Sequence, residues 1–359
     1  MIAMMRWKLA AMLLFMPAAA CSLSSCAVGM MAPMMLSTPA VGAGAAAIGG
    51  AAAIGGAAVG GAVAATPAPP AGAAPQQFIS APPAAAAAPA PIPAVAQGTF
   101  SPLDPDRLKA TSRPQAIALI IGIDRYKSAP PAEFAENDAR SFSAYAVTAL
   151  GVPPDRVRVL TGMEAQRLDI ERALITWVRP LIVKDQTDVF IFFSGHGLAS
   201  ADGNDLFLLP YDGDGDLLGE SSIRRRQLID AVVEAGARSA TLFLDTCYSG
   251  ATRNGDTLIA AARPVLIAAK PQDVPSNVTI LAAAANNQLS SALIPARHGL
   301  FSYFLMKGLE GAAAGADHAI TAGQLEDYLA SHIPAEAAKL GRTQTPQLIG
   351  NSDRVIASW

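Results

Sequence analysis

Two short motifs carry residue types that perform nucleophilic chemistry. They are SGHG at 194–197 and DTCYSG at 245–250. A thiolate that attacks a carbonyl carbon, paired with an imidazole that handles the proton of the leaving amine, is an arrangement used for acyl transfer. Cys247 is therefore the candidate nucleophile, and His196 the candidate general base and acid. Taken singly, each has a plainer interpretation: an inert buried thiol, or a structural histidine in a glycine-rich turn.

The predicted strands bring these motifs together. Uninterrupted apolar runs at 188–193 and 240–244 lead directly into them. Such runs are typical of strands that are buried on both faces of a parallel sheet. The carboxyl ends of parallel strands share one edge, where ligands bind. We therefore expect His196 and Cys247, 51 residues apart, to be neighbours in space. The backbone N–H groups of Gly197 and Cys247 are then the candidate oxyanion-hole donors.

Strand and helix patterns alternate along the rest of the charged half of the chain. Further strands are expected at 116–123, 156–160, 206–209 and 278–283. Helices are expected at 134–150, 168–183 and 225–235, around 301–309, and after a capping box at 321–324. This order predicts an α/β fold with a mostly parallel central sheet and helices on both faces.

With these features the chain resembles the caspase-like C14 peptidases, a family of clan CD cysteine peptidases, and in particular their bacterial metacaspase-type (orthocaspase) branch. The resemblance covers about 115–350. Beyond the two motifs it rests on IIGI at 120–123, NDA at 137–139, HGLFSYF at 298–304 and QTPQ at 344–347. It implies a caspase–haemoglobinase fold and cysteine endopeptidase activity on protein or peptide substrates.

The resemblance also implies a substrate preference. Caspases have Gln two positions before the nucleophile, whereas Asp245 stands there in this chain. In metacaspases this Asp and the Asp at the start of the first helix form an acidic S1 pocket, and the second position matches Asp138. Two carboxylates favour Lys or Arg at P1. The alternatives are a helix-dipole role for Asp138 and a role for Asp245 in orienting backbone amides.

Metacaspases often need calcium, which makes the acidic residues of this chain candidates for a calcium site. Six acidic residues lie within 202–220, and Asp212, Asp214 and Asp216 are spaced as in the start of an EF-hand. However, Leu217 and Ile223 stand where an EF-hand has Gly and Glu, so this is not an EF-hand. An acidic turn is the favoured interpretation. The histidines have no zinc-ligand spacing, and we expect neither a resident metal nor another cofactor.

Composition excludes some classes of protein. All 29 acidic residues and 24 of the 26 basic residues lie in 104–359, which is therefore net acidic. A basic nucleic-acid binder is disfavoured, because no Lys/Arg face is available to neutralise phosphates. Three cysteines rule out a disulfide scaffold.

The first 26 residues read as a secretory signal. Arg6 and Lys8 form a positive segment, residues 9–16 are apolar, and 18–20 are a small-residue cleavage site. An uncleaved membrane anchor is the alternative. LSSC at 23–26 resembles a bacterial lipobox with Cys26 as the lipidated residue, and Cys21 is a weaker match. We expect export from the bacterial cytoplasm, either as a periplasm-facing lipoprotein on a membrane or as a secreted protein.

Residues 27–105 read as a low-complexity tether ahead of a peptidase domain at 106–359. The Gly/Ala-rich repeat at 41–65 is either a flexible linker or a glycine zipper that inserts into a membrane. Residues 66–105 contain eleven prolines, which favours an extended chain. A fold alone does not imply catalysis. A membrane-tethered caspase-like binding or scaffold module is therefore the runner-up to the endopeptidase.

Overall fold

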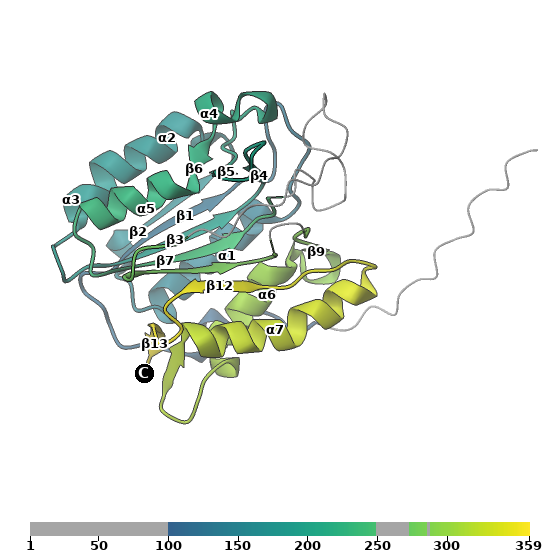
Figure 1. Cartoon of the computed structure of the whole chain (residues 1–359). Helices are drawn as coiled ribbons and strands as arrows, with labels where there is room; N and C mark the ends of the chain where they lie inside the picture. Colours follow the sequence, from purple (N-terminus) through teal and green to yellow (C-terminus); the bar gives the residue numbers. More distant parts are fainter. Residues whose placement is uncertain (1–99, 249–272, 286–287) are drawn as a thin grey trace, which may run out of the picture. The chain divides into compact units, whose positions relative to one another are not determined.

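The computed structural model describes residues 100–248, 273–285 and 288–359 (Figure 1). The predicted signal segment 1–26, with Cys21 and Cys26, lies outside the described residues. The same holds for the repeat at 41–65 and for all of the predicted tether except its last residues.

The central sheet has six strands in the order β12-β8-β7-β3-β1-β2. Every neighbouring pair is parallel except β12 with β8, which is antiparallel, so the predicted mostly parallel sheet is confirmed. The strands are β1 Ile117–Gly122, β2 Val157–Thr161, β3 Asp188–Ser194, β7 Ser239–Asp245, β8 Val278–Ala282 and β12 Gln347–Gly350. β1, β3, β7 and β8 are buried along their whole length, as expected for continuous apolar runs.

Helices cover both faces of this sheet (Figure 1). One face carries α1 Ala135–Thr148, α6 Leu300–Lys307 and α7 Ala322–Lys339. The other carries α2 Arg167–Arg172, α3 Arg179–Leu181 and α5 Arg225–Glu234. Successive β1 side chains point into opposite cores: Ile120 belongs to the core that contains Phe142 of α1, and Leu119 to the core that contains Leu228 of α5.

Smaller elements complete the described fold. β4 Gly197–Ala199, β5 Leu206–Leu208 and β6 Ile223–Arg224 form a sheet beside α4 Leu218–Ser221. β9 Ala292–Leu293 pairs with β10 His298–Gly299, and β11 Ala319–Thr321 with β13 Val355–Ser358. Short 3-10 helices lie at Pro105–Arg107, Pro154–Arg156, Gly162–Glu164, Gly215–Leu217 and Ile294–Ala296, and π-helical stretches at Ala173–Val178 and Gly308–Ala312.

Local signals in the sequence fix several helix ends. α7 begins with the predicted capping box, in which Thr321 Oγ1 accepts from Gln324 N and Gln324 Oε1 accepts from Thr321 N. α5 ends before Gly236, whose φ of 86° suits glycine. The predicted helix 168–183 is α2 and α3 joined by the π-helical stretch, a detail that apolar spacing does not indicate.

An ionic cluster around the buried Asp188 fixes the amino end of β3. Asp188 Oδ1 accepts from Arg238 Nε at 3.0 Å and from Ser239 Oγ at 2.6 Å. Burial by itself raises the pKa of Asp188. These hydrogen bonds and the neighbouring arginine charges, including that of Arg113, outweigh burial and hold this pKa below its ordinary value. The cluster therefore stabilises the fold above the ordinary range of aspartate titration, and this contribution is lost as the pH falls.

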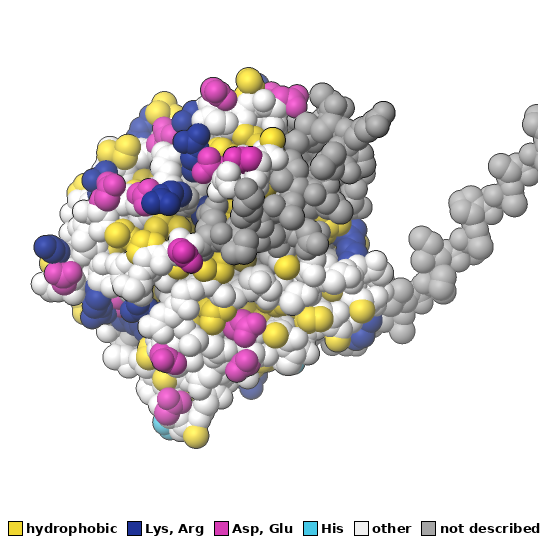
Figure 2. Space-filling view, viewed as in Figure 1, with side chains coloured by type: hydrophobic (Ala, Val, Ile, Leu, Met, Phe, Trp, Pro, Cys, Tyr) yellow, Lys and Arg dark blue, Asp and Glu magenta, His cyan; other side chains and the backbone are white. Residues whose placement is uncertain are grey.

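The surface does not gather one sign of charge on the face seen in Figure 2, where Lys/Arg and Asp/Glu side chains are interspersed. Among the described residues, the helices are too short or too polar to cross a bilayer.

Candidate active site

The register of β3 and β7 places the two predicted catalytic residues at matching positions. Ser194 pairs with Asp245 in the parallel ladder, and Gly195 N donates to Asp245 O at 3.2 Å, which extends the ladder by one residue. His196 and Cys247 each stand two residues beyond the Ser194–Asp245 pair. Neighbouring strands lie about 4.8 Å apart. The backbones that carry His196 and Cys247 therefore lie side by side at the carboxyl edge of the sheet.

Gly197 lies against the backbone that carries the thiol. A Cβ added to Gly197 would lie 2.5 Å from Thr246 Oγ1 and 3.0 Å from Cys247 O. Any larger residue at 197 would push the histidine segment away from the cysteine segment. The glycine therefore permits the close approach between the two motifs.

A main-chain carbonyl is the third group of the site. His196 Nε2 lies 2.8 Å from Pro130 O, in the 123–134 loop between β1 and α1. Because a carbonyl oxygen only accepts, Nε2 carries the hydrogen and Nδ1 holds the lone pair of the neutral ring. Nδ1 is thus the basic atom. Every residue type supplies a carbonyl, so no side chain in the sequence could have indicated this partner.

Both catalytic candidates are shielded from solvent, with His196 1 % and Cys247 3 % exposed. Charges interact more strongly where water is excluded. The attraction between a thiolate and an imidazolium formed here would therefore be stronger than at a surface, and it would act against the cost of removing both charges from water.

The structure brings Asp138 and Asp245 to the same face of the sheet. Asp138, in the first turn of α1, accepts from Ser194 Oγ at 2.9 Å. Ser194 is the ladder partner of Asp245. Asp245 Oδ2 in turn accepts from Ser302 of α6, which packs on the same face as α1. Both carboxylates are fully buried.

Residues 290–302 supply several partners of these two carboxylates. Asp138 Oδ1 lies 2.8 Å from His298 Nδ1 and accepts from Gly299 N at 3.1 Å. Asp245 accepts from Ser290 Oγ at 2.5 Å, and from both Oγ and N of Ser302, at 2.6 and 3.2 Å. The helix-dipole interpretation accounts for the position of Asp138 in α1 but not for these contacts. The backbone-orienting interpretation of Asp245 agrees with its bond from Ser302 N.

The acidic segment 202–220 forms bonds within the fold. Asp212 Oδ1 accepts from Arg167 N, and Asp214 Oδ1 accepts from Asp216 N. Asp205 lies 3.7 Å from Arg224. Within the described ranges, no group of three or more His, Cys, Asp and Glu side chains is arranged to hold a metal ion.

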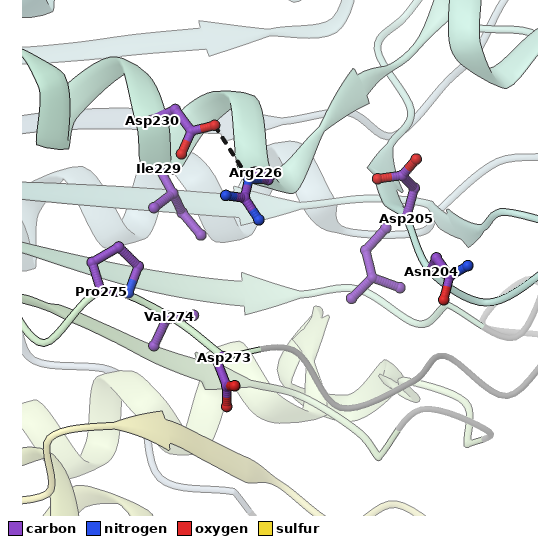
Figure 3. A pocket seen from close by; sticks show the side chains of 9 residues that line it. Asn204, Asp205, Arg226, Ile229, Asp230, Asp273, Val274 and Pro275 are labelled. Atoms are coloured by element: carbon purple, nitrogen blue, oxygen red, sulfur yellow. Dashed lines mark ion pairs between the residues drawn. The ribbon is translucent and has the colours of Figure 1, made fainter.

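A cavity of about 360 Å³ lies apart from these residues, between the chain before β5, α5 and the segment before β8 (Figure 3). Asp205, Asp230 and Asp273 line it, and Arg226 is 3.4 Å from Asp230 in an ion pair. Neither His196 nor Cys247 lines it. We therefore place the chemistry at the edge of the sheet and not in this cavity.

The chain was compared with known proteins. The family model described as caspase domain, Peptidase C14, matches residues 115–354. No curated protein sequence matches at the required significance. A solved structure of a Geobacter sulfurreducens protein is similar at 20% identity and a TM-score of 0.49, covering 67% of this chain and 95% of that one. Caspase-1 from Spodoptera frugiperda is similar at 14% identity and a TM-score of 0.46, covering 73% and 99%.

Proposed function

Because the chain belongs to the caspase-domain family of peptidases, we propose that it is a cysteine endopeptidase with a Cys247–His196 dyad. The observation that carries this proposal is the β3–β7 register, which delivers both residues to one edge of the sheet. Runs of apolar residues alone would build the same strands. The two residues with chemically active side chains follow directly beyond these strands.

In the proposed mechanism, the Cys247 proton passes to His196 Nδ1, and the thiolate attacks the scissile carbonyl carbon. The resulting oxyanion is held by the N–H groups of Gly197 and Cys247. The imidazolium then protonates the leaving amine, and an acyl-enzyme remains. His196 next takes a proton from water, which hydrolyses the thioester and regenerates the thiol. Pro130 O keeps Nδ1 directed toward this chemistry by accepting from Nε2.

We further propose that Asp138 and Asp245 bind an Arg or Lys side chain at P1. The support is their placement on one face of the sheet, where Asp138 accepts from Ser194 Oγ and Asp245 is the ladder partner of Ser194. Ser194 and Asp245 stand two residues before His196 and Cys247. A cationic side chain fits two buried carboxylates by charge. Their contacts with residues 290–302 fix the position of both groups.

The second candidate is the binding or scaffold module with little or no peptidase activity. The observation that favours it is the burial of the nucleophile, because a thiol that is 3 % exposed does not receive a peptide without a change in its surroundings. This reading keeps the same fold and the same edge of the sheet as a recognition surface.

A peptidase assay on the full chain separates these candidates. Fluorogenic peptides with Arg, Lys, Asp or Leu at P1 are offered with and without calcium. We expect cleavage after Arg and Lys at least tenfold faster than after Asp or Leu. Cleavage only after Asp or after apolar residues would refute the acidic pocket. No cleavage by the folded protein in any condition would favour the scaffold module. Activity only with calcium would show a metal requirement.

We also propose that the chain is exported and anchored by lipid on Cys26, with Cys21 as the second candidate. The support is the LSSC motif after an apolar signal segment. We expect the protein expressed in bacteria to incorporate labelled fatty acid and to sediment with membranes. Cys26→Ser should lose both properties if Cys26 is the anchor, and Cys21→Ser provides the matched comparison. Unlabelled, fully soluble wild-type protein would refute the anchor.

A further inference from the structure

Tyr126, in the 123–134 loop, makes two separate contacts with His196. Its hydroxyl oxygen accepts from the His196 backbone N–H at 2.7 Å. Its ring lies against the imidazole, with centroids 4.8 Å apart and an interplanar angle of 28°. Sequence reasoning did not single out this tyrosine. The rule that ligand-binding loops follow the carboxyl ends of parallel strands applies to β1 as well, and would have pointed to this loop.

The residue before the histidine leaves room for this contact. A Cβ added to Gly195 would overlap the Tyr126 hydroxyl, so no larger side chain fits at 195 while Tyr126 keeps its place. Gly195 thus leaves room for the Tyr126 hydroxyl, whereas Gly197 allows the close approach to the cysteine segment.

The loop that carries Tyr126 is tied to the fold on both sides. Lys127 N donates to Tyr211 O at 2.9 Å, and Ala132 N donates to Asp124 O at 2.8 Å. Asp124 Oδ1 also accepts from Glu136 N at the start of α1. Two groups of this one loop therefore hold the His196 side chain. The Tyr126 ring contacts the face of the imidazole, and the Pro130 carbonyl contacts Nε2.

We propose that Tyr126 is a positioning residue for the catalytic base. This inference rests on the proposed function. The hydroxyl fixes the backbone of His196, and the ring supports the imidazolium that forms when the Cys247 proton moves to Nδ1. An aromatic face attracts a cation more than a neutral ring, so the stack favours the thiolate–imidazolium pair over the neutral pair. The charged residues of the same loop, which are Asp124, Arg125, Lys127 and Glu133, are unchanged in every variant below.

The test separates the ring from the hydroxyl. Alkylation of Cys247 by iodoacetamide is followed against pH in the full chain, with the Cys247 peptide quantified by mass spectrometry so that Cys21 and Cys26 do not contribute. For Tyr126→Leu we expect about five- to tenfold slower alkylation at neutral pH and a profile displaced to higher pH, because the imidazolium loses its support. For Tyr126→Phe, which keeps the ring, we expect the wild-type profile.

Peptide turnover provides the second readout. Tyr126→Phe leaves the buried His196 N–H without its acceptor, so we expect kcat to fall about three- to tenfold with KM within twofold of the wild type. Tyr328→Leu is the matched control. This variant removes a ring whose centroid lies 4.3 Å from that of the His332 ring. The contact is similar but lies on α7, outside the site. The alkylation profile and kcat should therefore both match the wild type.

Each outcome decides the inference. Alkylation profile and kcat of Tyr126→Leu within twofold of the wild type would overturn it, as would equal effects of Tyr328→Leu. If Tyr126→Leu does not fold, an unchanged kcat in Tyr126→Phe overturns it. Should the wild type cleave no peptide, the alkylation profiles still decide: a displaced profile in Tyr126→Leu supports the role of Tyr126 while the proposed peptidase function fails.

Discussion

Cys247→Ala is expected to lower kcat/KM for the best Arg or Lys peptide by about 10⁴-fold or more, because the proposed mechanism forms the acyl-enzyme on this sulfur. The substitution removes only a sulfur atom from a buried position, so the melting temperature should change by a few degrees at most. The measurement is turnover of the fluorogenic peptide by the full chain, with circular dichroism to verify the fold.

The proposed dyad leads to a second, stricter prediction. Residues that act as one unit have non-additive effects. His196→Ala should therefore cost nearly as much as Cys247→Ala, and the double variant should be no worse than either. Additive losses would mean that the two residues contribute separately, which the β3–β7 register does not predict.

Asp188→Asn is the control for effects that are transmitted through β3. Asp188 begins the strand that ends just before His196, and its contacts lie at the opposite edge of the sheet. We expect this variant to lose stability but to retain activity.

Cys247→Ala with activity within tenfold of the wild type would remove Cys247 from the mechanism and leave the binding module as the better account.

Apolar pattern was enough to predict the strands that build the site. The runs that became β1, β3, β7 and β8 are buried on both faces, and such strands have the strongest sequence signal. β12 was not predicted, because its four residues are exposed or half-buried at an edge and its antiparallel pairing depends on β8 alone.

The contacts of the site were less accessible to sequence reasoning. Asp138 was predicted as a pocket residue, but its bond to His298 joins positions 160 residues apart. Pro130 acts through its carbonyl and Tyr126 through a stack. None of these has a local pattern, because each depends on how loops meet at the sheet edge after the strands have paired.

Asp245→Asn is the substitution expected to change substrate choice most. It keeps the shape of the side chain and one oxygen for Ser290 or Ser302, but it removes the negative charge. A charge-assisted hydrogen bond is worth about 2–3 kcal/mol. We therefore expect kcat/KM for Arg at P1 to fall on the order of 30- to 100-fold, with Leu at P1 within threefold of its wild-type value.

The ratio of Arg to Leu cleavage is what separates a pocket residue from a structural one. Ser302→Ala is the matched variant, because it removes a donor to Asp245 and leaves the charge. It should lower the free energy of unfolding by about 1 kcal/mol while the Arg/Leu ratio is maintained. If Asp245→Asn instead lowered Arg and Leu cleavage equally, its carboxylate would serve only to tie β7 to α6. Any preference for basic P1 residues would then have to come from Asp138, which Asp138→Asn would test.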